Sequence, residues 1–235
     1  MKLDDPNAYI TATEFDVMER CLPLEDATVL ELGCGRARIT RLIAERYRPA
    51  AIIATEVDRI QHEKNLLIDD LPTVRFVYGG AEEIALPDAS IDIVIMLKSL
   101  HHVPVELMDQ ALAEIQRVLK PGGIAYISEP VYAGDFNEIM KLFNDEQVVR
   151  QAAFAAICRA VGAGLFIDSD QIFFNAPGRY RDFADFDEQM LQVTHTQHNI
   201  DAALRRQIEA AFNRHMGDDG ARFLRPSRVD LLRKP

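Results

Sequence analysis

The stretch Val29-Leu30-Glu31-Leu32-Gly33-Cys34-Gly35-Arg36-Ala37-Arg38 decides the fold of this chain. The apolar, β-branched run 28–32 predicts a buried strand, and apolar residues recur at helical spacing over 39–47. Glycine tolerates positive φ and lets a ligand approach the backbone, and the start of a helix leaves amide donors pointing outward. The turn at Gly33 and Gly35 therefore predicts a binding site.

An acidic residue after the turn narrows the identity of the ligand. Glu56 lies near the end of the second apolar run, 50–57, about 20 residues past the turn, where a carboxylate accepts hydrogen bonds from ribose hydroxyls. Dinucleotide-binding proteins use the same arrangement, but their fingerprint has a third glycine where this chain has Arg38. The residues favour a nucleoside cofactor with an unphosphorylated ribose, and NAD is the weaker alternative.

Beyond the turn, short β-branched runs alternate with amphipathic segments, which is typical of an α/β fold. Strands are expected over 28–32, 50–57, 74–78, 91–97 and 124–128, and helices over 39–47, 58–70, 104–119 and 137–161. A strand end and turn at 173–178, a helix over 200–216 and antiparallel strands within 223–232 are expected to follow. The pattern predicts a Rossmann-like open, mostly parallel seven-stranded sheet with helices on both faces and an antiparallel final strand.

Length and composition indicate how the chain is organised. With 235 residues and 48% hydrophobic content, we expect a single domain over 1–235, in which about 131–215 form an elaboration on the substrate side. The formal charge of −11 makes nucleic acid an unattractive partner, because cationic side chains would have to neutralise its phosphates. A small-molecule acceptor fits better. The basic side chains near the end, interpreted as a solvated surface, are Arg222, Arg225, Arg228, Arg233 and Lys234.

The cysteines and the apolar runs bear on location. Cys21, Cys34 and Cys158 form no CxxC pair and no metal-ligand spacing, which suits a reducing compartment, and no metal is expected. No apolar stretch approaches the length of a membrane span, and the first residues lack a signal-peptide core. We expect a cytoplasmic protein without membrane contact, and the sequence leaves its oligomeric state open.

Five segments in order resemble the class I S-adenosylmethionine-dependent methyltransferases, in particular the branch called methyltransferase type 11. They are Val29 to Ala37, Glu56, Gly79-Gly80-Ala81-Glu82-Glu83 with Leu86-Pro87, Ile91-Asp92-Ile93-Val94 leading to Leu100-His101-His102-Val103-Pro104, and Arg117-Val118-Leu119-Lys120-Pro121-Gly122-Gly123. Together they span about 29–130. The resemblance implies S-adenosylmethionine as cofactor and transfer of its methyl group to an O, N, S or C atom of an unidentified acceptor.

The resemblance also implies a set of cofactor-binding residues. These are Glu31, Gly33, Cys34, Gly35, Arg38, Glu56, Val57, Gly80, Ala81, Glu82, Leu97 and Lys98. The chain departs from the family at three places. Ala37 replaces the usual third small residue, glycine, and Lys98 is unusual directly after the fourth predicted strand. Gly80 stands where the family commonly has an aspartate that accepts from the adenine amino group. Recognition of adenine is therefore expected from backbone groups of Ala81 and Glu82, or from water.

Candidates for the chemistry follow the fourth and fifth predicted strands. For a hydroxyl or protonated amine acceptor, His101 and His102 are the first candidates for a general base, because histidine titrates near working pH. The family often carries this pair, so the alternative is that it shapes the loop or touches the cofactor. Glu129 and Tyr132 are expected either to face the acceptor or to anchor their loop.

Two further residues have competing interpretations. Lys98 faces the methionine carboxylate of the cofactor or an acidic substrate, or else it is a surface lysine. His195, three residues before His198, is assigned to a substrate lid rather than to a metal site, because no cysteine or carboxylate has a matching spacing. The alternative for the whole chain is a protein that binds S-adenosylmethionine or a related nucleoside without transferring a methyl group.

Overall fold

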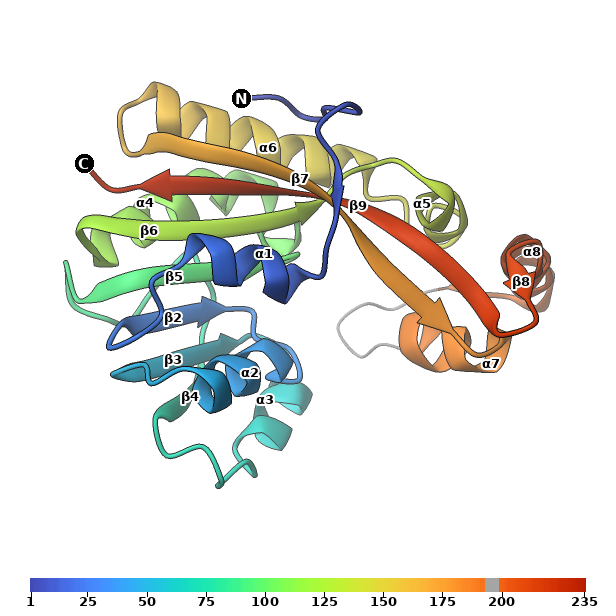
Figure 1. Ribbon diagram of the computed structural model, residues 1–235, viewed down its shortest axis with the longest axis horizontal. Helices are drawn as coiled ribbons and strands as arrows, with labels where there is room; N and C mark the ends of the chain where they lie inside the picture. The colour runs from blue at the N-terminus through green and yellow to red at the C-terminus, as the bar shows by residue number, and fades with distance from the viewer. Residues whose placement is uncertain (193–198) are drawn as a thin grey trace.

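A computed structural model describes residues 1–192 and 199–235, and within them the chain forms one sheet of nine strands (Figure 1). The strands are β1 Ile10–Thr11, β2 Thr28–Leu32, β3 Ala51–Glu56, β4 Val74–Tyr78, β5 Ile91–Leu97, β6 Leu119–Pro130, β7 Ile167–Tyr180, β8 Met216–Gly217 and β9 Gly220–Arg233. Their order is β1-β7-β9-β6-β5-β2-β3-β4, and β8 pairs with β9.

The pairing confirms the predicted sheet in all but its strand count. Strands β2 to β6 pair in parallel, and β9 runs antiparallel to both β6 and β7. The predicted count of seven was too low because β1 and β8 have two residues each, too few to show a period in the sequence. The chain leaves β2 toward β3 on one side, and β5 lies on the other side. Ligand crevices of open α/β sheets form at such a reversal of strand order.

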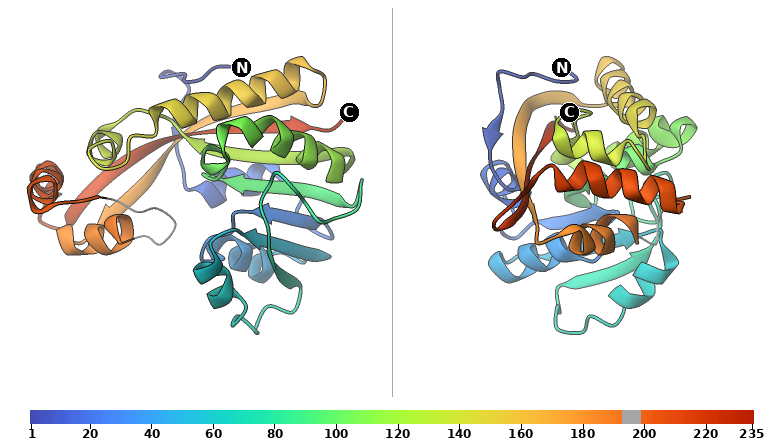
Figure 2. Two further views of the ribbon diagram at one scale, coloured as in Figure 1. Left: turned by 180° about the vertical axis from the view of Figure 1, so that it is seen from behind. Right: turned by 90° about the vertical axis from the view of Figure 1, so that its right-hand side faces the viewer.

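Eight α-helices accompany the sheet within the described residues. They are α1 Glu14–Cys21, α2 Arg38–Arg46, α3 Arg59–Asn65, α4 Met108–Val118, α5 Asp135–Met140, α6 Gln147–Gly162, α7 Phe183–Phe186 and α8 Ala202–Asn213. One apolar core lies between the sheet and α4 and α6, and another lies between the sheet and α1 and α2. Figures 1 and 2, seen from opposite sides, show these two pairs of helices on opposite faces.

The predicted apolar patterns explain these layers. In β5, Ile93, Val94 and Ile95 are at most 1% exposed, as expected of a strand covered on both faces. In α4, Met108, Leu112 and other residues of the predicted apolar stripe are fully buried. The period and composition of the sequence were sufficient to place these central elements.

Three predictions of local structure were wrong. The segment 137–161 forms two helices, α5 and α6, because Asp145 between them accepts a hydrogen bond from the Gln147 amide at 3.1 Å and starts a new helix. The segment 173–178 does not turn but continues through β7, paired with β9. The C-terminal basic cluster is not uniformly solvated, because Arg228 is 2% exposed and donates to Asp230 at 2.8 Å.

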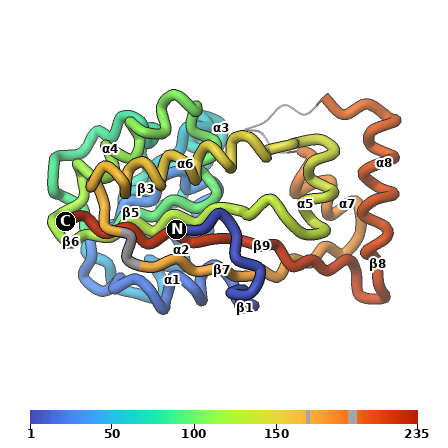
Figure 3. Tube along the Cα trace, turned by 90° about the horizontal axis from the view of Figure 1, so that it is seen from above, coloured from blue at the N-terminus to red at the C-terminus, as the bar shows by residue number. Residues whose placement is uncertain are grey.

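The strands β7 and β9 form a long antiparallel pair, and its far half, where β9 no longer pairs with β6, leaves the main sheet. We call this half, with the helices around it, the hairpin extension. Helices α5, α7 and α8 gather around this half, at one end of the molecule in Figure 3. They share an apolar cluster that includes Tyr180, Phe186, Phe212 and Phe223. This cluster is separate from the two cores of the sheet, so the hairpin carries a second packed body beside the carboxyl ends of the strands.

Candidate functional site

The glycine turn after β2 is held against the neighbouring strands. The amides of Gly33 and Cys34 donate to the Thr55 carbonyl of β3 at 3.0 and 2.8 Å. Gly33 has a φ of 73°, and a Cβ at this position would lie 2.9 Å from the Cβ of Ser99. Ser99 is fixed in turn, because its hydroxyl donates to the Leu32 carbonyl at 3.0 Å. The turn therefore needs glycine for both its conformation and its space.

The third position of the turn carries a conformational cost. Ala37, directly before α2, has a φ of 55° and a ψ of 30°, which is the left-handed region. A side chain in this region costs roughly 1–2 kcal/mol, which glycine avoids. The family that the chain resembles has glycine at this position, so the replacement by Ala37 adds backbone strain to the turn.

Glu56 links the glycine turn to the end of β3. Its Oε2 accepts from the Gly35 amide at 2.8 Å, and its Oε1 accepts from the amides of Val57 and Asp58, each at 2.8 Å. A carboxylate offers about four acceptor positions, so three backbone amides leave room for a further donor. Glu56 thus orders the turn and keeps acceptor capacity for a hydroxyl group such as that of a ribose.

A cavity of about 650 Å³ opens at the carboxyl ends of β2, β3, β4 and β5. Nine of the residues predicted to contact the cofactor line it: Gly33, Gly35, Glu56, Val57, Gly80, Ala81, Glu82, Leu97 and Lys98. The volume lies within the range of small-molecule and cofactor sites. The structure brings these residues together from four strand ends, although they are far apart in the sequence.

Three residues of the predicted set do not line this cavity. Glu31 is 3% exposed in β2, and its Oε2 accepts from the Thr40 hydroxyl at 2.5 Å. Cys34 is buried, with its Sγ 3.4 Å from the Asn65 amide nitrogen. Arg38 is exposed, and the neighbouring Arg36 lines the cavity in its place. An alternation of side chains through a tight turn is difficult to assign from spacing alone.

The burial of Glu31 predicts a dependence of stability on pH. Burial, opposed by the Thr40 hydrogen bond and assisted by the charge of Glu56, raises the pKa of Glu31 from 4.5 to about 7. A carboxyl whose pKa is raised on folding contributes stability below pH 4.5 that is lost as the pH rises through 7. The wild type should therefore lose roughly 3 kcal/mol of its free energy of unfolding as the pH rises through this range, and Glu31→Gln should not show this loss. Urea unfolding at pH 5 and pH 8 measures the free energy of unfolding, and Glu45→Gln is an exposed control. An equal change between the two pH values in wild type and Glu31→Gln would contradict the assignment.

A second cavity of about 280 Å³ adjoins the first one and lies toward the hairpin extension. Its walls come from the loop after β5, the segment 130–150, and the middle of β7 and β9. Lys98, His102 and Gln189 line both cavities. We call the smaller cavity the side chamber. The shared residues mark the junction at which a molecule in one cavity meets a molecule in the other.

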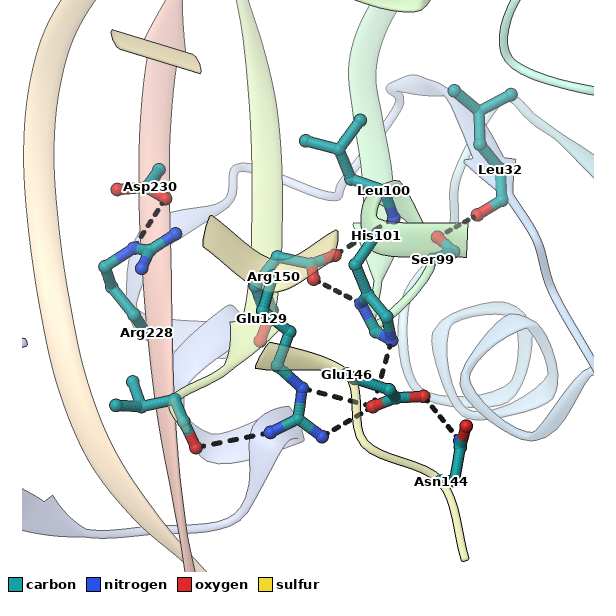
Figure 4. A network of polar contacts seen from close by, with 12 residues as sticks. Leu32, Ser99, Leu100, His101, Glu129, Asn144, Glu146, Arg150, Arg228 and Asp230 are labelled. Carbon is teal, nitrogen blue, oxygen red and sulfur yellow. Dashed lines mark hydrogen bonds and ion pairs between the residues drawn. The ribbon is translucent and has the colours of Figure 1, made fainter. Parts of the chain in front are cut away.

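His101 lines the side chamber and is held between two carboxylates (Figure 4). Its Nδ1 contacts Glu129 Oε2, and its Nε2 lies 3.7 Å from Glu146 Oε2. Burial of the ring opposes its charged form, but the carboxylates of Glu129 and Glu146 outweigh burial and hold the pKa of His101 above its ordinary value. His101 is therefore stabilised as an imidazolium and is poorly suited to accept a proton from a substrate.

His102, unlike His101, is open to both cavities. It is exposed and lines both cavities, and its ring centroid lies 4.2 Å from that of His101. Of the two histidines predicted as candidate bases, only His102 stands at the junction. The structure thus separates their roles, with His101 in the supporting network and His102 at the place where two bound molecules would meet.

Arg150 completes the network around His101. It donates to Glu146 at 2.6 and 3.1 Å and to the Asn137 Oδ1 at 3.0 Å. His101, His102 and Glu146 place ligand atoms within 4.8 Å of one another and could hold a metal ion. A cation there would stand beside the Arg150 guanidinium, which already neutralises Glu146, and would have to displace the proton of His101. We therefore expect no metal requirement.

The remaining predicted site residues take different places. Glu129 is 2% exposed, and its second oxygen accepts from the Leu100 amide at 2.9 Å, so it anchors the loop and does not face the side chamber. Tyr132 is half-buried and does not line the side chamber, whereas its neighbours Val131 and Ala133 do. Lys98 lies at the junction, 3.6 Å from Glu14. His195 lies outside the described residues.

No motif or spacing in the sequence singled out several of the residues that line the side chamber. Asn137, Arg150 and Arg225 come from α5, α6 and β9, and nothing in their spacing indicates a shared cavity. Gln189, after α7, reaches the junction because the hairpin extension brings it there. Only the tertiary arrangement of the extension reveals these residues.

Comparison with known proteins agrees with this geometry. Residues 30–127 match the family model described as a methyltransferase domain. A probable S-adenosylmethionine-dependent methyltransferase of Mycolicibacterium smegmatis is 35% identical over 104 residues, which are 43% of this chain and 37% of that protein. An uncharacterised methyltransferase of Mycobacterium bovis is 33% identical over 108 residues, 46% of this chain and 42% of that protein.

A solved structure extends the likeness of fold to nearly the whole chain. The YcgJ protein from Bacillus subtilis has a TM-score of 0.61 at 20% identity, over 93% of this chain and 97% of its own. The segment 30–127 therefore matches a methyltransferase domain, as the resemblance to the type 11 branch predicts. The chain spans about two fifths of the length of the curated relatives it matches. No helix among the described residues is long and apolar enough to cross a membrane.

Proposed function

We propose that this protein is an S-adenosylmethionine-dependent methyltransferase that acts on a small-molecule acceptor. The observation that carries the proposal is the pair of adjoining cavities that share Lys98, His102 and Gln189. The larger cavity has the glycine turn and the Glu56 carboxylate for a nucleoside. The side chamber is lined mainly by residues within 130–150, by parts of β7 and β9 and by Gln189 and Met190, and it has room for a small acceptor.

In this proposal the chain mainly positions the two reactants. The cofactor supplies an electrophilic methyl group on a sulfonium when bound. The side chamber orients the acceptor atom toward that group, and orientation of this kind lowers barriers by up to roughly 7–11 kcal/mol in favourable cases. His102 takes the proton of a hydroxyl or ammonium acceptor, and the fixed His101 network supports the loop that carries His102.

Glu82 is placed to replace the side chain that is missing at Gly80. A Cβ on Gly80 would lie 2.5 Å from Glu82 Oε1 and 2.7 Å from Glu82 Cδ, so the Glu82 carboxylate fills that space. Both residues line the larger cavity. We propose that this carboxylate, rather than the expected backbone groups, accepts from the amino group of adenine.

A pair of substitutions tests the adenine contact. We expect Glu82→Ala to weaken binding of S-adenosylhomocysteine about tenfold, as for loss of a hydrogen bond to a charged group, and to spare S-inosylhomocysteine, which lacks the amino group. Gly80→Asp should also weaken binding, and Gly80→Asp combined with Glu82→Ala should recover much of it. Calorimetry measures each affinity, and the exposed neighbour Glu83→Ala is the control. Equal losses for both nucleosides would contradict the contact.

The proposed reaction is tested by following the methyl group. Protein, S-adenosylmethionine with a deuterated methyl group and a small-molecule extract are mixed, and mass spectrometry searches for labelled products. We expect label in the small-molecule fraction, and we expect Glu56→Ala to abolish it while weakening S-adenosylhomocysteine binding. Tight binding of S-adenosylhomocysteine without label in any fraction would favour the alternative, a nucleoside-binding protein that transfers no methyl group.

A further inference from the structure

The side chamber has two hydrogen-bond donors without partners on the wall formed by α5 and β9. Asn137 is 5% exposed, and its Nδ2 has no hydrogen-bond partner among the described residues. The Nε of Arg225 is likewise buried and unpartnered. The large majority of buried side-chain polar atoms are hydrogen-bonded, so two unpartnered donors on the wall of one cavity indicate an acceptor from outside the chain.

The orientation of the Asn137 amide follows from its neighbour. Arg150 donates to the Asn137 Oδ1 at 3.0 Å, and a guanidinium has donors only. The oxygen of the amide must therefore face Arg150, and the NH₂ group must face away from it. Asn137 can offer only donors to a molecule in the side chamber.

Arg225 also lacks a counter-charge. Its guanidinium lies 5.6 Å from the centre of the Phe136 ring and contacts the Pro177 carbonyl at 3.4 Å, but no carboxylate pairs with it in the described part of the chain. The cations Lys98, Arg150 and His101 of the side chamber are paired with Glu14, Glu146 and Glu129, respectively. One positive charge of the side chamber is thus left for a ligand.

The two donors lie away from the junction with the larger cavity. Neither Asn137 nor Arg225 lines the larger cavity, whereas His102 and Lys98 line both. Apolar side chains, among them Phe136, Met140 and Met190, line the rest of the side chamber. The walls therefore suit a molecule with an apolar body and one anionic end.

We propose that the acceptor is an apolar molecule with a carboxylate, which Arg225 and Asn137 bind, so that the opposite end of the molecule points to the methyl group at the junction. The inference rests on the proposed function, because it assigns the side chamber to the acceptor. A carboxylate offers two acceptor oxygens, one for each donor, and a negative charge for Arg225. The methylated atom is then at the end remote from this carboxylate.

Three probes of equal length test the inference: octanoate, octanamide and octylammonium, each titrated into protein saturated with S-adenosylhomocysteine. We expect octanoate to bind at least about tenfold more tightly than octanamide, and octylammonium to bind least. Asn137→Asp keeps an acceptor for Arg150 but removes the donor, so it should weaken octanoate binding at least about tenfold and favour octylammonium. Arg225→Gln should also weaken octanoate binding. Arg222→Gln, an exposed arginine of β9 paired with Asp219, is the matched control.

The outcomes separate this inference from the proposed function. Equal affinity for the three probes, no octanoate binding up to millimolar concentration, or unchanged octanoate binding in both Asn137→Asp and Arg225→Gln would overturn the carboxylate site. Each of these results, obtained with intact binding of S-adenosylhomocysteine, leaves the methyltransferase proposal standing. Failure of the wild-type protein to bind S-adenosylhomocysteine would instead overturn the proposed function. Titration of octanoate alone would then still test whether Asn137 and Arg225 bind a carboxylate.

Discussion

Gly33→Val is expected to reduce the affinity for S-adenosylhomocysteine by more than about 100-fold, or roughly 2.7 kcal/mol. Two effects add at this position. The φ of 73° is unfavourable for any side chain and especially for a β-branched one. The new Cβ would lie 2.9 Å from the Cβ of Ser99. Ser99 lines the cavity and is held in place by the hydrogen bond from its hydroxyl to the Leu32 carbonyl. Calorimetric titration measures the loss.

Two companion variants make the Gly33 result interpretable. Gly33→Ala adds only the Cβ, so it should already weaken binding if contact with Ser99 is the cause. Gly162→Ala, at the end of α6, has open space around its Cβ and no positive φ, and it should bind as the wild type does. Circular dichroism verifies the fold of each variant. Wild-type affinity in a folded Gly33→Val protein would refute the placement of the cofactor at this turn.

The sequence was sufficient for the central sheet because its elements carry strong local signals. The continuous apolar run of β5 and the stripe of α4 leave few alternatives, and both are buried as expected. The break between α5 and α6 was missed because apolar residues continue as far as Phe143 and resume at Val148, while between them Asp145 accepts a hydrogen bond from the Gln147 amide. The length of β7 was missed because Pro177 and Gly178 are typical of turns, yet both residues pair with β9.

The candidate site was predictable only where it is built from strand ends. The carboxyl ends of parallel strands share one edge of a sheet, so Gly33, Glu56 and Gly80 were placed together from the sequence. The side chamber combines α5, α6 and the middle of β9, and their packing depends on a hairpin extension that no motif specifies. Its walls, including Asn137 and Arg225, therefore follow only from the three-dimensional arrangement.

Glu129→Gln is expected to be the most destabilising of the carboxylate substitutions. Glu129 is buried, contacts His101 and accepts from the Leu100 amide at 2.9 Å. Removing its charge leaves the His101 imidazolium without its closest counter-ion, and breaking a buried ion pair costs roughly 3–5 kcal/mol. For a chain of this length the melting temperature should fall by about 6–20 °C. Urea unfolding and calorimetry measure both quantities.

The pH dependence of this loss identifies its cause. Burial alone would raise the pKa of Glu129, but His101 outweighs burial and lowers it below the ordinary 4.5, so this contribution to stability is present above pH 4.5. The pKa of His101 is raised above 6.5, so its contribution is complete below pH 6.5 and is lost as the pH rises through the raised value. The difference in free energy of unfolding between wild type and Glu129→Gln should therefore be largest between pH 4.5 and 6.5.

The control is Glu138→Gln, which removes an exposed pair with Lys141 and should change stability by less than about 1 kcal/mol at any pH. A loss for Glu129→Gln that is independent of pH would show that packing, not the charge of His101, sets the stability of this loop.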